Sequence, residues 1–272
     1  MTRLDPDKIL AYCHIGKVGG KRFQFYLRSH FGTRCRCVAR TRGPVYTKEE
    51  LEIDLRWNPN IEYVGGHGIR PHVDYGAIGD RLLWFSLFRN PLTRILSHHY
   101  QQTVLRNFKA DSVLDWLQKY PNRAYWQIYM ISGGNNLAKA KDIVQNQYAF
   151  VGLNEHYEQS LFLFAKTFGL EGFRFTDGRL LPKPEKTGIL QEIREDFEDH
   201  KDDILELLED EIDFYNFVKT VYDKQCVDYG KEKLDQELNL HFQISRPLKK
   251  YNANNLASII KDRIPLRTFE VP

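Results

Sequence analysis

The sequence predicts an α/β fold, a doubly wound parallel sheet flanked by helices. Short apolar runs alternate along the chain with segments whose apolar residues recur at helical spacing, and this alternation favours a parallel sheet covered by helices. The run Leu82 to Phe88 is almost entirely apolar, as in a strand that is buried on both faces. At 272 residues the chain can bury a substantial core, and we expect residues 1–272 to form a single domain.

The expected strands are short apolar runs. Gly16 bounds the first run, Gly65 follows the second, and Arg89 follows the third directly. The expected strands are Ile9 to Ile15, Ile61 to Val64, Leu82 to Phe88 and Tyr148 to Leu153, with Phe173 to Phe175 as a candidate for a last strand. Thr33 to Thr47 is basic and irregular, which indicates a surface loop.

Helical spacing and end signals place the helices. Gly32 closes the first helix, and Asn90 with Pro91 is typical of a helix start. The expected helices are Arg22 to Phe31, Lys48 to Leu55, Pro91 to about Asn107, two or three between Asp111 and Val144, Glu155 to Phe168, and a long acidic helical region from Gln191 to Cys226. The tail, residues 228–272, shows no clear pattern and stays unassigned.

Composition excludes several classes of function. The 39 basic and 36 acidic residues are too balanced for bulk nucleic-acid binding, so we expect no nucleic-acid partner. The four cysteines lack the paired spacing of a zinc site and are expected to be reduced thiols. No apolar run is long enough for a transmembrane segment, and the first ten residues lack the apolar core of a signal peptide. We therefore expect a cytoplasmic protein; the sequence does not indicate its oligomeric state.

The stretch CHIGKVGGKRF, Cys13 to Phe23, resembles a phosphate-binding loop between a strand and a helix. Glycines let backbone N–H groups approach an anion, the helix N-terminus adds its dipole, and a lysine supplies charge. A Walker A loop is not present, because its first glycine is Ile15 here and its hydroxyl residue is Arg22. A glycine turn with solvated basic residues is the plain alternative for this stretch alone.

A second anion site is predicted at the end of the strand Leu82 to Phe88. Arg89 follows this strand, and Ser97 lies two turns into the next helix. Because ligands of open parallel sheets bind at the carboxyl ends of the strands, Arg89 and the first loop are expected to face one crevice. A guanidinium and a hydroxyl suit a phosphate monoester, so the pair of sites predicts a ligand phosphorylated at two places.

Four segments resemble the Golgi-type carbohydrate sulfotransferases. His14 to Gly20 is similar to the H-I-P-K-T-G-G loop of that family, and Phe88 to Tyr100 is similar to its R-D-P-x-x-R-x-x-S-x-Y element. Val151 to Leu161 resembles V-G-L-T-E-x-F-x-x-S-L, and Leu205 to Val221 resembles a late D-x-x-x-Y helix. The segments occur in family order over roughly residues 9–222.

The resemblance implies a P-loop-like sulfotransferase fold and a metal-free transfer. The donor would be 3′-phosphoadenosine 5′-phosphosulfate (PAPS), the product 3′-phosphoadenosine 5′-phosphate, and the acceptor a hydroxyl or amine of a glycan or small molecule. By the resemblance, Lys17 is catalytic and stabilises the departing charge. The residues that it implies for cofactor binding are Lys17, Gly19, Gly20, Lys21, Arg22 and Phe23 around the 5′ end and Arg89 and Ser97 at the 3′-phosphate. Family hydroxyl residues are replaced by Lys21 and Arg22.

The resemblance also implies a catalytic base. His67 matches the histidine of the uronyl 2-O-sulfotransferase type, and a histidine can accept a proton near neutral pH. His72 and Asp74 are nearby substitutes and Glu62 a weaker one, while a loop histidine bonded to backbone is the plain alternative for His67.

Three further segments, rich in basic residues or histidine, have both a functional and a structural interpretation. Lys183, Lys186 and Thr187 match a family loop that covers the cofactor, and a solvated linker is the alternative. Arg34 to Arg42 is a candidate for attracting an anionic acceptor, although a charge run is usually a solvated face. The pair His98 and His99 is interpreted as helix surface and packing.

Two other functions are retained as alternatives. One is a nucleotide-phosphate binding or kinase-like protein that uses the same loop. The other is an inactive sulfotransferase-like interaction module, because the loop departs from the family pattern at several positions.

Overall fold

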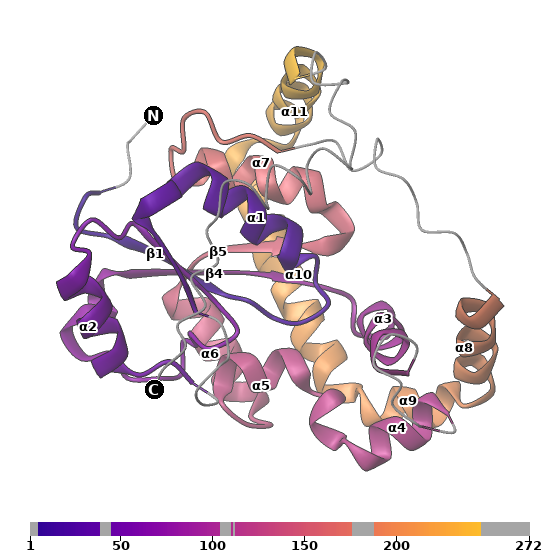
Figure 1. The fold of residues 1–272 in the computed structure, drawn as a ribbon. Coiled ribbons are helices and arrows are strands. Elements are labelled where there is room, and N and C mark those ends of the chain that lie inside the picture. Colours follow the sequence, from indigo (N-terminus) through magenta and orange to yellow (C-terminus); the bar gives the residue numbers. More distant parts are fainter. Residues whose placement is uncertain (1–4, 39–44, 104–109, 111, 176–187, 246–272) are drawn as a thin grey trace.

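One parallel sheet organises the chain. The computed structural model describes residues 5–38, 45–103, 110, 112–175 and 188–245. Five strands, all paired in parallel, lie in the order β2-β3-β1-β4-β5 (Figure 1). The strands are β1 (Ile9–Cys13), β2 (Cys35–Val38), β3 (Tyr63–Gly66), β4 (Leu82–Phe88) and β5 (Tyr148–Leu153). The predicted parallel sheet is confirmed.

The strand order reverses at β1, which lies at the centre of the sheet. From β1 the chain builds β2 and β3 on one side and β4 and β5 on the other. Ligands of such sheets bind at the carboxyl edge beside this reversal. Because Cys13 of β1 lies opposite Gly66 of β3, the residues that follow these two strands emerge side by side.

Helices cover both faces of the sheet. On one face, Phe23 of α1 (Gly20–Phe31) and Phe164 of α7 (Tyr157–Thr167) pack against Phe85 of β4. On the other face, Phe214 of α10 (Glu209–Tyr229) packs against Phe88, with ring centroids 5.8 Å apart. The helices are α1 (Gly20–Phe31), α2 (Lys48–Trp57), α3 (Pro91–Thr103), α4 (Val113–Lys119), α5 (Trp126–Ser132), α6 (Leu137–Gln147), α7 (Tyr157–Thr167), α8 (Gly188–Asp199), α9 (Lys201–Leu207), α10 (Glu209–Tyr229) and α11 (Lys231–Ser245), with the 3-10 turns η1 (Gly32–Arg34), η2 (Gly76–Arg81), η3 (Pro121–Arg123) and η4 (Asn154–His156).

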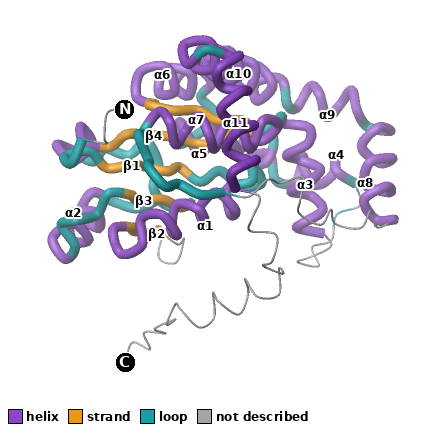
Figure 2. Tube along the Cα trace, turned by 90° about the horizontal axis from the view of Figure 1, so that it is seen from above, coloured by secondary structure: helices purple, strands orange, loops and turns teal. Residues whose placement is uncertain are grey.

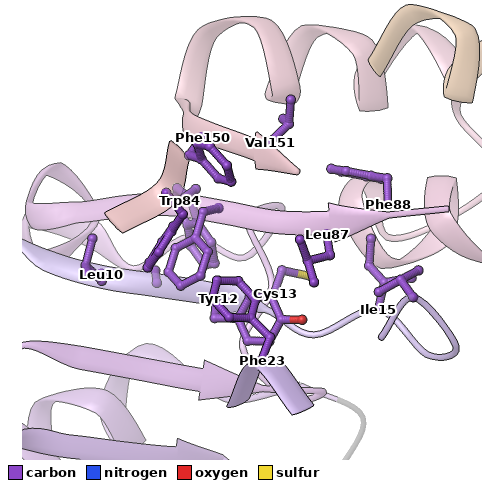
Figure 3. Packing of buried hydrophobic residues seen from close by; sticks show 14 of the residues in the cluster. Leu10, Tyr12, Cys13, Ile15, Phe23, Trp84, Leu87, Phe88, Phe150 and Val151 are labelled. Atoms are coloured by element: carbon purple, nitrogen blue, oxygen red, sulfur yellow. The ribbon is translucent and has the colours of Figure 1, made fainter. Parts of the chain in front are cut away.

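The apolar residues form two clusters. The larger surrounds the sheet, where Tyr12 and Phe23 meet below β4 with ring centroids 5.4 Å apart (Figure 3). The smaller joins α3, α4, α8 and α9, which lie together at one end of the molecule (Figure 2). Ile95 of α3 and Trp116 of α4 are buried in it.

The strand β2 corrects the prediction of a loop over Thr33 to Thr47. It pairs with β3 in parallel along all four of its residues. Its sequence, CRCV, is short and carries a cation, which gives little strand signal and is common in edge strands that must not pair with other chains. Residues 39–44 of the predicted loop lie outside the described residues.

The candidate strand Phe173 to Phe175 is wrong, because these described residues form no strand. Both phenylalanine rings are instead buried in the core, where Phe173 lies near Phe164 and Phe175 near Tyr26. Their apolar pattern therefore reflects burial and not sheet pairing.

The expected helices are present, most with a different start or end, and the predicted end near Asn107 lies outside the described residues. The first begins at Gly20, not Arg22, and the acidic region is divided into three helices at His200 and Leu208. The tail carries α11, which packs against α7 and α10, and its residues Leu234 and Phe242 are buried. None of the helices in the described part of the chain combines the length and apolar character needed to cross a bilayer.

Candidate functional site

The loop between β1 and α1 depends on two glycines. Gly19 has a left-handed backbone (φ 86°), and a Cβ there would lie 2.6 Å from Asn154 Nδ2. A Cβ on Gly20 would lie 2.2 Å from the ring of His14. The loop can therefore lie against its neighbours only without side chains at these two positions.

Contacts from the end of β5 fix this loop. Asn154 donates through Nδ2 to the carbonyl oxygen of Val18 at 3.1 Å, and the Tyr157 hydroxyl donates to the carbonyl oxygen of Gly19 at 3.3 Å. The helix α1 then begins at Gly20, and no side chain caps it. Its first N–H groups have no acceptor within the helix, so the positive end of the helix dipole is available to an anion.

A cavity of about 680 Å³ lies at the carboxyl ends of β1, β3 and β4. Cations dominate its wall, and none of the described residues that line it is Asp or Glu. The lining residues are His14, Gly16, Lys17, Gly19, Gly20, Lys21, Arg22, His67, Arg70, Arg89, Ser97, His98, Gln101, Gln102, Arg123, Trp126, Met130 and Asn154. Six of these are lysine or arginine, so the charge of the wall suits an anion.

Arg89 connects the two predicted anion sites. Its Nη1 donates to the carbonyl oxygen of Lys17 at 3.1 Å, and its Nε donates to Thr93 Oγ1 at 3.1 Å. Burial lowers the pKa of Arg89 and the Glu155 carboxylate opposes this, but a guanidinium stays charged at neutral pH. Ser97 lines the same cavity from α3. The structure thus brings the residues predicted for two anionic groups into one cavity.

His67 lines the cavity with a defined tautomer. Its Nδ1 lies 2.6 Å from the carbonyl oxygen of His14, and a carbonyl can only accept, so Nδ1 carries the proton. In the neutral ring the lone pair is then on Nε2. The rings of His67 and His14 stack with centroids 4.2 Å apart. Burial, followed by the charges of His67 and Lys21, lowers the pKa of His14 to about 3, so His14 stays neutral.

Comparison with known proteins does not identify a family for this chain. No protein-family model matches the chain, and no curated protein sequence matches it. Among solved structures, a sulfotransferase from Alicyclobacillus acidocaldarius is 15% identical, with a TM-score of 0.41 over 75% of this chain and 95% of that one. This similarity is too low to indicate the fold or the activity of the chain.

Phe23 is the described cofactor-binding candidate that does not line the cavity. Its ring is fully buried between Tyr12, Phe85 and Phe164, and its N–H donates to the carbonyl oxygen of Gly19. The side chain of Phe23 packs α1 against the sheet and does not line the cavity, so its place among the cofactor-binding residues stays a prediction. Lys183, Lys186 and Thr187 lie outside the described residues.

The substitute bases do not line the cavity either. His72 Nδ1 lies 3.2 Å from the carbonyl oxygen of Ile131, and Asp74 accepts from the N–H of Gly76 at 2.7 Å. Glu62 precedes β3, at the amino end of the strand, and pairs with Arg34. His67 is thus the member of this group that lines the same cavity as Lys17.

The basic stretch Arg34 to Arg42 is partly neutralised. Arg34 pairs with Glu62, and Arg36 Nε lies 2.5 Å from Asp54 Oδ2. These two cations belong to ion pairs beside β2 and do not line the cavity. Arg40 and Arg42 lie outside the described residues.

Several lining residues carry no sequence signal. Arg70 is 2% exposed and donates through Nε to the carbonyl oxygen of His67 at 3.3 Å. The Arg123 guanidinium lies over the ring of Trp126 at 4.7 Å. Trp126 Nε1 is buried and has no hydrogen-bond partner among the described residues, which leaves it as a donor for a ligand. His98 and His99, interpreted as helix surface and packing, are both buried, and His98 lines the cavity and packs edge-on against Trp116.

Proposed function

We propose that the chain is a sulfotransferase that uses PAPS as donor and a hydroxyl or amine of a glycan or small molecule as acceptor. One observation carries the proposal. A single cavity holds a cationic loop at a helix N-terminus together with Arg89, which directly follows β4, and Ser97 of α3. A ligand with an anionic group at each end fits this arrangement, and PAPS is such a ligand.

The residues present fit this donor. Lys17, Lys21 and the first N–H groups of α1 would hold the 5′ end, and Arg89 with Ser97 would hold the 3′-phosphate. The volume is within the range of small-molecule sites. When bound, PAPS supplies the sulfuryl group and a phosphate leaving group.

Lys17 and His67 would have different tasks. The Lys17 ammonium would neutralise charge on the leaving phosphate, which is an electrostatic role. His67 Nε2 would accept the proton of the acceptor group, because the bond from Nδ1 to the carbonyl oxygen of His14 fixes the basic nitrogen. The neutral His14 ring packs against His67 without competing for the proton.

The kinase-like alternative requires oxygen ligands for Mg²⁺. No Asp or Glu lines the described part of the cavity, which favours a sulfuryl donor over ATP with Mg²⁺. The cytoplasmic location stays a prediction, in keeping with the free thiols of the four cysteines.

A thermal-shift panel tests the proposal. Stabilisation by 3′-phosphoadenosine 5′-phosphate without Mg²⁺ is the expected result, since a ligand that binds only the folded state raises the melting temperature. Stabilisation by ATP with Mg²⁺ alone would favour the kinase-like protein. No shift with either ligand would favour an inactive interaction module.

A further inference from the structure

We propose that Glu211 and Tyr215 of α10 are positioning residues that hold the corner Arg89-Asn90 in the geometry needed by the 3′-phosphate site. The two residues are four apart and so lie on one face of the helix. Each reaches the corner through one intermediate residue. The inference rests on the proposed function for the identity of the ligand, but not for the contacts themselves.

The first connection runs through Gln127. Glu211 accepts from the N–H of Gln127 at 2.9 Å through Oε1 and from the N–H of Ile128 at 3.2 Å through Oε2. The Gln127 side chain then accepts from the N–H of Arg89 at 3.0 Å and donates to the carbonyl oxygen of Arg89 at 3.0 Å. Both main-chain polar groups of Arg89 are therefore fixed from α10.

The second connection runs through Glu155. The Tyr215 hydroxyl donates to Glu155 Oε2 at 3.0 Å, and Glu155 Oε1 accepts from the N–H of Asn90 at 2.8 Å. This bond fixes the residue that follows Arg89. The Arg89 guanidinium also donates to the carbonyl oxygen of Lys17. A rotation of the corner Arg89-Asn90 would therefore move the guanidinium away from the loop after β1.

Glu211 has a further role that complicates its use in a test. It lies 3.4 Å from Arg94 Nη2, and both side chains are fully buried. Arg94 in turn donates to the carbonyl oxygen of Arg123, another residue of the cavity wall, at 2.7 Å. Removing the carboxylate would leave a buried charge unpaired, which destabilises a fold strongly. Tyr215 is therefore the residue to change.

Tyr222 provides a matched control on the same helix. Its hydroxyl donates to Gln159 Oε1 at 2.9 Å, and Gln159 donates onward to Asp235 of α11, away from the cavity. Tyr215→Phe and Tyr222→Phe each remove one hydrogen bond from a buried ring of α10. A loss of stability that comes only from removing a buried hydroxyl of α10 should be similar in the two variants.

Two measurements on the full chain test the inference. Calorimetric titration with 3′-phosphoadenosine 5′-phosphate should give a Kd about three- to tenfold higher for Tyr215→Phe and unchanged for Tyr222→Phe, as expected for one lost positioning bond. Hydrogen exchange at the Asn90 amide should be faster in Tyr215→Phe only.

The two readouts separate two failures. If the wild-type chain does not bind the nucleotide, the proposed function is wrong, and the exchange of Asn90 still decides the positioning role. Equal rates of hydrogen exchange at the Asn90 amide in Tyr215→Phe and Tyr222→Phe overturn the inference. If the wild-type chain binds 3′-phosphoadenosine 5′-phosphate, equal Kd values of the two variants also overturn it.

Discussion

The Arg89 guanidinium donates to the main-chain carbonyl oxygen of Lys17, with Nη1 and the oxygen 3.1 Å apart. This contact joins the end of β4 to the loop after β1. The two proposed phosphate sites are therefore coupled, and a change at one should be felt at the other.

Replacing Arg89 by lysine tests whether the planar guanidinium group, and not only its charge, is needed. Arg89→Lys keeps the positive charge. A lysine cannot donate to Thr93 Oγ1 and to the Lys17 carbonyl oxygen at the same time in the geometry of the Arg89 Nε and Nη1 groups. We expect the Kd for 3′-phosphoadenosine 5′-phosphate, measured by calorimetry, to rise about tenfold. Arg56→Lys on the exposed side of α2 is the control and should bind normally. An unchanged Kd for Arg89→Lys would show that charge alone matters there.

Lys17 has a left-handed backbone, with φ 71°. Lys17→Ala and Lys17→Gly both remove the ammonium group, and both should reduce sulfuryl transfer by about two to three orders of magnitude. Because glycine adopts this conformation without steric cost, Lys17→Gly should unfold in urea with a free energy about 1 kcal/mol higher than Lys17→Ala. The reverse order of stability would contradict the backbone geometry of the loop.

Gly20 is closely surrounded, and a Cβ there would lie 2.2 Å from the His14 ring and 2.5 Å from the Tyr12 hydroxyl. Gly20→Ala should lower the free energy of unfolding by about 1–3 kcal/mol through overpacking, and it should weaken nucleotide binding. Gly134→Ala is the control, because a Cβ at Gly134 meets nothing within 4 Å. Equal denaturant midpoints for the two variants would show that the loop has room at Gly20.

His14 should make stability depend on pH. Burial, with His67 and Lys21, lowers its pKa to about 3 in the folded chain, whereas an unfolded histidine titrates near pH 6.5. Between these values the unfolded chain binds a proton that the folded chain does not, so stability falls as the pH is lowered.

The comparison of wild type with His14→Gln isolates this effect. From pH 7 to pH 5 the wild-type free energy of unfolding should fall by about 2 kcal/mol more than that of the variant. Urea titrations at the two pH values measure the difference. A fall of equal size in both proteins would mean that His14 is protonated when folded.

The sequence predicts the sheet best where a strand is buried on both faces. The continuous apolar runs give β4 and β5 their correct ends, whereas β2 is missed because its four residues, CRCV, are mostly half-exposed or exposed and include a cation. Phe173 and Phe175 show the converse error, since burial of aromatic rings looks like a strand in the sequence.

The candidate site is predictable where its residues follow strands. Lys17 lies in the loop that follows β1 and Arg89 comes directly after β4, and parallel strands bring their carboxyl ends together. The contact between His14 and His67 depends on β1 lying beside β3, a strand order that the sequence does not specify. Arg123 comes from the 3-10 turn η3 between helices, with no motif to mark it.

The central claim is that a single cavity binds a ligand that carries phosphate groups at two positions. One measurement tests this claim most directly. Calorimetry without Mg²⁺ would compare 3′-phosphoadenosine 5′-phosphate with adenosine 5′-phosphate, for the wild-type chain and Arg89→Ala. We predict that the wild type prefers the first ligand by at least about tenfold and that Arg89→Ala loses this preference while still binding the second. Equal binding of the two ligands by the wild type, or a preference that survives in Arg89→Ala, would contradict the account.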